Sequence, residues 1–151
     1  MIPIHWSCKR FDELSTPELY CILHLRSTVF VVEQNCVYLD TDNRDAEAYH
    51  LCGWLHNKLV AYCRLLPPGV AYPDEASIGR VVTAPAHRNS GFGQILMSKA
   101  IPQTFELFSV TSIKIGAQQY LTKFYGDLGF SIISEPYLED GIPHVQMRII
   151  K

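Results

Sequence analysis

The sequence has no long uncharged or apolar run. No stretch without Asp, Glu, Lys or Arg exceeds ten residues, as in Asn89–Ser98, whereas a membrane-spanning helix needs about 20 predominantly apolar residues. The first thirteen residues already carry four charged side chains and contain no apolar run of the length found in secretory signal peptides. We therefore expect no membrane contact and a cytoplasmic protein.

An excess of charge of either sign is also missing. The chain has 13 Lys and Arg against 15 Asp and Glu, which gives a formal net charge of −2. A near-neutral chain has no general attraction for nucleic acid or for anionic lipid, so neither is an expected partner.

Closely spaced metal ligands are the third absence. The five cysteines, at positions 8, 21, 36, 52 and 63, form no C-x-x-C pair. Structural zinc sites use ligands at short spacing. The sequence therefore predicts no metal site, and we expect the cysteines to be small buried hydrophobic residues with free thiols.

The material for a hydrophobic core is present. Of the 151 residues, 48% are hydrophobic and only 19% are charged. This length and composition fit one ordinary globular domain. No internal repeat or linker-like run divides the chain, so we expect a single domain over residues 1–151.

A first helix is predicted from Ser15 or Thr16, both of which suit the N-cap position, with Pro17 in its first turn. One face of this helix carries mainly apolar residues at helical spacing. They are Leu19, Ile22, Leu23, Arg26 and Phe30. Arg26 therefore lies in the middle of an apolar face.

Three arginines, Arg26, Arg64 and Arg80, are predicted to point inward, because the last two interrupt strand-like runs. A buried arginine keeps its charge and needs an anionic or carbonyl partner. Internal ion pairs are one interpretation. Nearby carboxylates for such pairs are Glu33, Asp40, Asp42 and Asp45. The other interpretation is a cleft that binds a substrate carboxylate.

The remaining elements alternate between strands and helices. The predicted strands are Ile4–Cys8, Tyr49–Leu55, Leu59–Leu66, Ala76–Ala84, Val110–Ile115, Phe130–Ser134 and His144–Ile150. A second helix begins near Phe92, and Pro102 should kink or end it; a third is predicted over Ala117–Leu128. This order indicates an α/β (α+β) fold, with a mixed, mostly antiparallel sheet flanked by helices.

The most informative motif is Arg88-Asn89-Ser90-Gly91-Phe92-Gly93, between a buried strand and a helix. Unpaired N–H groups and the helix dipole favour an anion at such a helix start. A Walker loop is excluded because Gln94, rather than Lys, follows Gly93. A dinucleotide-binding fingerprint is disfavoured because Leu96 stands at its third glycine position.

In this context the motif resembles the pyrophosphate loop of the Gcn5-related N-acetyltransferases (GNAT), which reads Q/R-x-x-G-x-G/A. The run Gln118–Phe130 also resembles the family outline N-x-x-A-x-x-F-Y-x-x-x-G-F, although Gln118 replaces the usual Asn and Leu121 the usual Ala. Four further runs are similar to the ElaA-type branch. They are residues 30–34, 78–81, 116–118 and 139–144.

The resemblance implies acetyl-CoA as co-substrate, no metal, and direct attack of an amine on the thioester. The residues of the Arg88–Gly93 loop would hold the diphosphate, and Gln118 would add an amide contact. Backbone N–H groups of Val81, Val82 and Thr83 would bind the pantetheine arm and the developing oxyanion.

By the same resemblance, Tyr125 would protonate the thiolate leaving group, unless it is an ordinary core tyrosine. Many relatives place a glutamate in the central strand as the base, but Ile78, Gly79 and Arg80 stand there. The base candidates left are Asp40, Glu139, His144 and Glu33, of which we favour Glu33. Contacts to the acceptor are expected from Arg26, Arg64, Arg80 and His144.

Two other functions remain open from the sequence. Acyl-homoserine-lactone synthases carry an Arg and a Phe on the first helix and an acidic loop, as Arg26, Phe30, Asp40 and Asp42 do here, and they use S-adenosylmethionine. A non-catalytic coenzyme A-binding module is the other alternative, since the central glutamate is missing. The acceptor is expected to be an amine of a small molecule or protein, and the assembly state is left open, a homodimer included.

Overall fold

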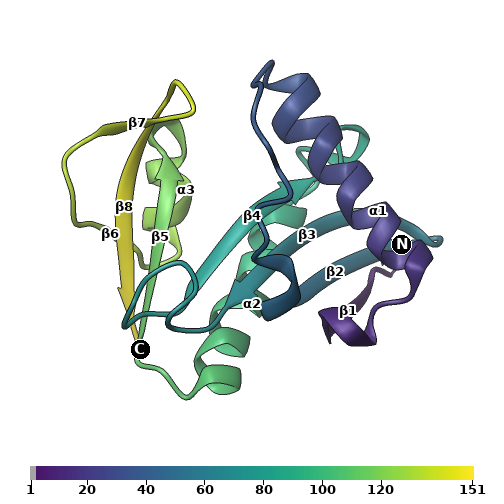
Figure 1. The fold of residues 1–151 in the computed structure, drawn as a ribbon, viewed down its shortest axis with the longest axis horizontal. Helices are drawn as coiled ribbons and strands as arrows, with labels where there is room; N and C mark the ends of the chain where they lie inside the picture. The colour runs from purple at the N-terminus through teal and green to yellow at the C-terminus, as the bar shows by residue number, and fades with distance from the viewer. Residues whose placement is uncertain (1–2) are drawn as a thin grey trace.

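The computed structural model describes residues 3–151 and contains two antiparallel sheets (Figure 1). The first sheet has the order β1-β2-β3-β4. Its strands are β1 (His5–Arg10), β2 (Tyr49–Leu55), β3 (Lys58–Leu66) and β4 (Ser77–Thr83). His56 and Asn57 form the tight turn between β2 and β3 in the left-handed backbone region, a conformation that a two-residue hairpin turn requires.

The second sheet is built around the long strand β8, which pairs antiparallel with every other strand of that sheet. Its strands are β5 (Ser112–Gln118), β6 (Ser131–Ile132), β7 (Tyr137–Glu139) and β8 (Ile142–Ile150). Strand β7 is an addition to the predicted order. It turns into β8 through Asp140 and Gly141, both of which have positive φ.

The two sheets touch at one end only. Ala76, just before β4, forms an isolated parallel bridge with Ile113 of β5, and the Lys114 amide donates to the Ala76 carbonyl at 3.0 Å. Figure 1 shows β4 and β5 close together near the C-terminus and apart at their other ends. Beyond Ala76, no described strand pairs with the β5-facing edge of β4.

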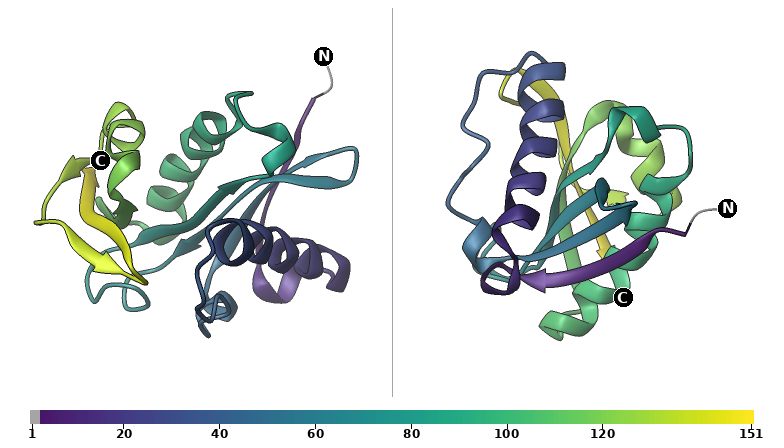
Figure 2. Two further views of the ribbon diagram at one scale, coloured as in Figure 1. Left: turned by 90° about the horizontal axis from the view of Figure 1, so that it is seen from above. Right: turned by 90° about the vertical axis from the view of Figure 1, so that its right-hand side faces the viewer.

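Helices cover both faces of the first sheet (Figure 2). Helix α1 (Thr16–Arg26) packs on one face with a small core around Ile22, Tyr62 and Val82. The larger core lies on the opposite face, under α2 (Phe92–Phe108), and extends to α3 (Thr122–Asp127) and the second sheet. The short helical turns are η1 (Phe11–Glu13), η2 (Ser27–Glu33), η3 (Asp45–Glu47), η4 (Pro85–His87) and η5 (Gln119–Leu121).

The predicted fold class is confirmed, and so is the N-cap of α1, where the Ser15 hydroxyl accepts from the Glu18 amide. The predicted apolar face was only partly right. The buried residues of this segment are Ile22, Leu25, Arg26 and Val29. Leu19, Leu23 and Phe30 are only partly buried, because the apolar face is rotated toward Leu25 and the chain widens into the π-helix η2 after Arg26.

Two helix boundaries are decided by the structure. Of the two alternatives predicted at Pro102, a kink or an end of the helix, the end is excluded, because α2 continues to Phe108. Its buried face runs on through Thr104 and Phe105, so core packing outweighs the backbone hydrogen bond that proline cannot donate. The third helix begins at Thr122 rather than Ala117, because Ala117 and Gln118 pair with Val145 and His144 as the end of β5.

The described residues contain no helix with the length and apolar character needed to cross a bilayer.

Glu75, just before β4, bonds to side chains of β5 and β8 at the end where the two sheets touch. Its carboxylate accepts two hydrogen bonds of 2.7 Å from Arg148 of β8 and a third from the Ser112 hydroxyl. The hydrogen bonds from Arg148 contribute most to lowering the pKa of Glu75, to about 2. A lowered carboxyl pKa stabilises the fold above the unfolded-state pKa, and this stabilisation is lost as the pH falls through the folded-state pKa.

We therefore expect Glu75→Gln to lower the free energy of unfolding at pH 7, with a difference from wild type that shrinks between about pH 4.5 and pH 2. Urea unfolding across this pH range measures the difference. The matched control is Glu47→Gln, an exposed carboxylate, which should show little change at any pH. A Glu75→Gln difference that is independent of pH would contradict the ion-pair explanation.

Candidate active site

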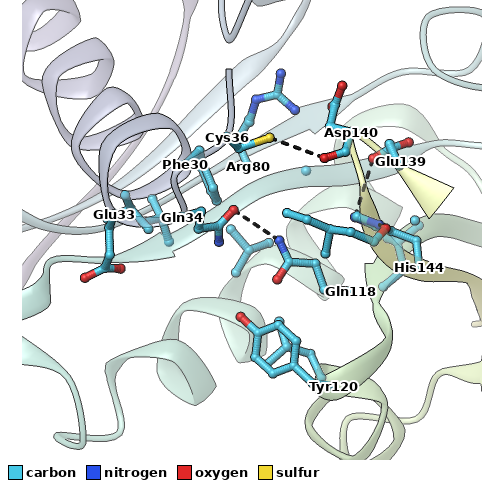
Figure 3. Close-up of a pocket in the computed structure, with 18 of the residues that line it drawn as sticks. Phe30, Glu33, Gln34, Cys36, Arg80, Gln118, Tyr120, Glu139, Asp140 and His144 are labelled. Carbon is cyan, nitrogen blue, oxygen red and sulfur yellow. Dashed lines mark hydrogen bonds and ion pairs between the residues drawn. The ribbon is translucent and has the colours of Figure 1, made fainter. Parts of the chain in front are cut away.

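A cleft of about 500 Å³ lies where β4 and β5 have separated. Its walls come from η2 and the following loop, from β4, from β5 and η5, and from the β7–β8 turn. Figure 3 shows these side chains converging from elements far apart in the sequence. The cleft contains most of the residues singled out from the sequence. They are Glu33, Arg80, Val81, Val82, Thr83, Arg88, Gln118, Tyr125 and His144.

Strand β4 presents backbone amides to this cleft. The Ala84 amide donates to the Val60 carbonyl of β3 at 2.8 Å, and Val82 pairs with Tyr62 in the same register. Because backbone groups alternate in direction along a strand, Val81 and Thr83 turn their amides away from β3, to the unpaired edge. The amide of Val82 faces β3, so the expectation that it binds a ligand was wrong.

A bulge in β4 accompanies this unpaired edge. Tyr62 pairs with Val82 but Arg64 pairs with Gly79, so Arg80 and Val81 lie opposite one residue of β3. Arg80 has φ of 51°, an unfavourable conformation for a residue with a side chain. Bulges bend and twist the strand that contains them, and this one lies in the cleft wall.

The Arg88–Gly93 motif forms the N-terminus of α2, as predicted. Gly91 is the N-cap residue with φ of 77°, no side chain caps this end, and the first helical bond is from Ile95 to Gly91. The amides of Phe92, Gly93 and Gln94 are therefore available to an anion. Of this motif only Arg88 lines the cleft itself; Asn89, Ser90, Gly91, Phe92 and Gly93 lie outside its lining.

Gly93 has no conformational reason to be glycine. Its φ is not positive, and an added Cβ would meet Phe124 and Thr83 only at ordinary contact distances of 3.7 to 3.9 Å. The described chain thus has room for a side chain at Gly93. A ligand that approaches the backbone closely would account for the glycine, and the three free amides beside it favour an anion.

Glu33 and Arg88 form an ion pair at the rim of the cleft. Glu33 ends the π-helix η2, and its carboxylate accepts two hydrogen bonds from the Arg88 guanidinium, one of them at 2.9 Å. The hydrogen bond from Arg88 lowers the pKa of Glu33 and raises that of Arg88. An exposed carboxylate with a lowered pKa is a poor general base, so the geometry argues against our sequence-based choice of Glu33.

Tyr125 lines the cleft from α3 and is 7% exposed. Burial raises the pKa of its hydroxyl far above the ordinary value, so the group stays protonated at neutral pH. Its ring packs edge-on against Phe124 and Phe130, with centroids 5.1 and 5.9 Å away. Tyr125 is one of the residues that line the cleft, and within residues 3–151 its hydroxyl forms no hydrogen bond. It can therefore donate a proton to a ligand atom.

Two contacts cross the cleft and divide it. The Gln118 amide of β5 donates to the Gln34 side chain at 3.4 Å, and the Cys36 thiol lies 3.6 Å from the Asp140 carbonyl. Figure 3 shows Glu33 and His144 on opposite sides of the Gln34–Gln118 contact. Gln34 and Cys36 were not predicted as site residues, because their positions depend on how the loop after η2 folds over the sheet.

His144 is buried in the cleft wall, on the opposite side of the Gln34–Gln118 contact from Glu33. It lies in β8, paired in register with Gln118 of β5, and its Nδ1 lies 2.7 Å from the Ile142 carbonyl. Its Nε2 lies 3.5 Å from the Glu139 carboxylate. The acidic turn and His144 thus come together in the cleft wall.

Arg26 and Arg64 are not in the cleft, and the expectation that they bind substrate was wrong. Arg26 is fully buried and donates to Asp40 at 2.9 Å and to Asp45 at 2.7 Å. Arg64, 2% exposed, donates to Asp42 at 2.8 Å and to Asp45 at 2.9 Å. Their guanidinium groups are occupied by carboxylates of the loop between η2 and β2, which is the internal ion-pair alternative.

Arg80 belongs to both the cleft and this network. It lines the cleft, but its Nε donates to Asp40 at 2.9 Å and its guanidinium lies 5.5 Å from the centre of the Tyr38 ring. A role for Arg80 in substrate binding would therefore use a guanidinium that is already held in place by Asp40.

No group of three or more His, Cys, Asp or Glu side chains in the described part of the chain is arranged to hold a metal ion.

Comparison with known proteins agrees with the fold. A family model described as an acetyltransferase (GNAT) domain matches residues 39–151. The chain belongs to the GNAT acetyltransferase family. Protein ElaA of Escherichia coli is 41% identical over 146 residues, 95% of each chain, and its crystal structure superimposes with a TM-score of 0.90 over 97% of this chain and 99% of ElaA. This GNAT protein is therefore of the ElaA type.

Two further GNAT structures are informative. An acyl-CoA N-acyltransferase from Pseudomonas aeruginosa is 42% identical, with a TM-score of 0.92 over 97% of this chain and 99% of the other. A GNAT family acetyltransferase from Elizabethkingia anophelis with acetyl-CoA bound is only 14% identical, over 98% of each chain, and shares the fold with a TM-score of 0.66.

The arginine–aspartate network generates a prediction about stability. Arg26→Met keeps much of the side-chain volume but leaves Asp40 and Asp45 without this buried partner. Breaking a buried pair in this way costs about 3–5 kcal/mol. Thermal or urea unfolding measures the loss. The control is Lys123→Met, which removes an exposed pair with Asp127 and should cost about 0.5 kcal/mol or less. Equal effects of the two substitutions would contradict a structural role for Arg26.

Proposed function

We propose that this GNAT protein transfers an acetyl group from acetyl-CoA to a primary amine by direct attack on the thioester. The observation that carries the proposal is the free edge of β4 beside the uncapped N-terminus of α2, where Gly93 leaves space that the chain itself does not use. The Pseudomonas relative is an acyl-CoA N-acyltransferase, which supports the same class of reaction.

The nucleotide end of acetyl-CoA would lie at the start of α2. The amides of Phe92, Gly93 and Gln94 point their N–H groups outward, and the helix dipole adds favourable charge for a diphosphate. Arg88 lies at the rim, and its Nε would donate to a phosphate oxygen while its two terminal nitrogens stay bonded to Glu33. Asn89 and Ser90 complete the exposed loop on this side.

The pantetheine arm would run along β4. The amides of Val81 and Thr83 offer the hydrogen bonds that a neighbouring strand would otherwise receive, and one of them can donate to the thioester carbonyl oxygen as negative charge develops there. Gln118, on the opposite wall, offers a side-chain amide. When bound, acetyl-CoA itself supplies the activated acetyl group.

Tyr125 would protonate the departing thiolate. The residue lines the cleft, and its hydroxyl is protonated at neutral pH and has no hydrogen-bond partner within the described chain, so its proton would be available when the thiolate forms. The five cysteines are all free thiols, which fits our expectation that the reaction takes place in the reducing cytoplasm.

One internal contact counts against the synthase alternative. Arg26 and Asp40, which resemble residues of acyl-homoserine-lactone synthases, are bonded to each other inside the protein and do not face a ligand together. We therefore expect coenzyme A thioesters, and not S-adenosylmethionine, to raise the melting temperature. Stabilisation by S-adenosylmethionine alone would favour the synthase.

Binding of acetyl-CoA is predicted to increase the free energy of unfolding by RT ln(1 + [L]/Kd) and so to raise the melting temperature. Gly93→Ala should fold with wild-type stability, because a Cβ fits within the chain, but should weaken acetyl-CoA binding about tenfold or more, a loss of about 1.4 kcal/mol. Isothermal titration calorimetry measures the Kd. The matched control is Gly126→Ala in α3, where an added Cβ meets open space. Wild-type affinity in Gly93→Ala would contradict the proposed seat of the diphosphate.

Tyr125→Phe separates an enzyme from a binding module. It should leave acetyl-CoA affinity within about twofold and lower the rate of thiol release about 100-fold or more, the usual contribution of a positioned acid. The control is Tyr20→Phe on the exposed face of α1, which should behave as wild type. Full acetyl-CoA binding with no amine-dependent thiol release in wild type would show a non-catalytic module instead.

A further inference from the structure

On the side of the Gln34–Gln118 contact that is away from Glu33, the cleft wall contains a well-oriented proton acceptor, His144. His144 is buried under the β7–β8 turn, and its ring lies nearly parallel to that of Tyr137, with centroids 5.9 Å apart and planes at 30°. Stacking and burial fix the plane of the imidazole. The residue also lines the cleft, so the fixed ring is next to the space where an acceptor would bind.

The hydrogen bond to Ile142 assigns the protons of this imidazole. A carbonyl oxygen only accepts, so Nδ1 at 2.7 Å from it must carry the hydrogen. In the neutral ring, Nε2 then holds the lone pair. This is the same orienting contact that fixes the tautomer of histidines acting as bases or metal ligands elsewhere.

The groups that face His144 come from three strands, and a carboxylate lies beside its Nε2. On β7 and its turn these are the Glu139 carboxylate, 3.5 Å from Nε2, the Tyr137 ring and, one residue on, Asp140. On β5 the neighbour is the uncharged Gln118. Both arginines that line the cleft are paired with carboxylates, Arg80 of β4 with Asp40 and Arg88 with Glu33.

The other candidates for the base are already engaged. Glu33 is paired with Arg88 on the far side of the Gln34–Gln118 contact (Figure 3). Asp40 is buried between Arg26 and Arg80. We propose that His144 Nε2 takes the proton from the acceptor ammonium, with Glu139 as the residue that positions it. This inference rests on the proposed function and deepens it.

The acceptor class follows from the same side chains. Glu139 and Asp140 place two carboxylates at this end of the cleft, so a cationic primary alkylamine, neutralised only on binding, fits better than an anionic one. This conclusion departs from the carboxylate-bearing acceptor that the three arginines suggested, since Arg26, Arg64 and Arg80 are all held by aspartates.

The protons and bonds of the transfer balance. The ammonium proton passes to His144 Nε2, and the freed nitrogen lone pair attacks the thioester carbonyl carbon. A carbon–nitrogen bond forms and the carbon–sulfur bond breaks. The thiolate takes the Tyr125 proton, the tyrosinate regains one shed by the acylated nitrogen through water, and His144 releases its proton to solvent. The products are the amide, free thiol and one proton.

His144→Asn tests this role and keeps the hydrogen bond to the Ile142 carbonyl, because the asparagine amide nitrogen can replace Nδ1 as its donor. With putrescine and an Nα-acetyl-lysine peptide as probes, we expect kcat to fall about 100-fold or more and the KM for acetyl-CoA to stay within about twofold. Transfer to hydroxylamine, which is already neutral at pH 7, should be largely retained. The control is His24→Asn on the exposed face of α1, which should match wild type.

Glu139→Gln gives a second test. The Glu139 side chain is largely exposed, so this substitution should leave the fold intact. Loss of its negative charge should move the rising limb of kcat against pH to lower pH, and His144→Asn should abolish that limb. Wild-type rates with alkylamines in His144→Asn, or an unmoved limb in Glu139→Gln, would overturn this inference alone. Absence of transfer to any probe in wild type would instead overturn the proposed function, and this inference with it.

Discussion

The separation of β4 from β5 is the constraint on which the rest of the structure depends. Buried backbone N–H groups need acceptors, and a strand in the middle of a protein normally finds them on both sides. After Ala76, β4 has them on the β3 side only. The amides of Val81 and Thr83 are left for a ligand, and the space opened by the parting strands becomes the cleft. The site is thus an unpaired strand edge, whose free amides can donate hydrogen bonds to a ligand.

The buried ion-pair network is connected to this separation through Arg80. That residue sits in the β4 bulge with a left-handed backbone, a conformation that costs of order 1–3 kcal/mol for a residue with a side chain. Asp40 holds the Arg80 guanidinium through both its carboxylate and its carbonyl, and it also holds Arg26. A cluster outside the cleft therefore fixes the shape of the cleft wall. This explains why inward-pointing arginines looked like substrate ligands in the sequence.

What the sequence predicted well are features set by local chemistry. The Ser15 cap and the helix start after Gly91 each follow from residues within a few positions of one another. Features decided by tertiary packing were harder to predict. Helix α2 passes Pro102 because its buried face continues, and Ala117 and Gln118 stay in a strand because β8 lies beside them. Glu33 was a reasonable base by position, but only the fold shows that Arg88 occupies it.

Amide hydrogen exchange along β4, measured by NMR with and without acetyl-CoA, tests the central claim most directly. Val82 bonds to β3 and serves as an internal reference within the same strand. The account predicts rapid exchange at Val81 and Thr83 in the free protein and strong slowing of both on addition of acetyl-CoA, with Val82 protected throughout. Protection of Val81 and Thr83 before any ligand is added, or exchange that acetyl-CoA leaves unchanged, would contradict it.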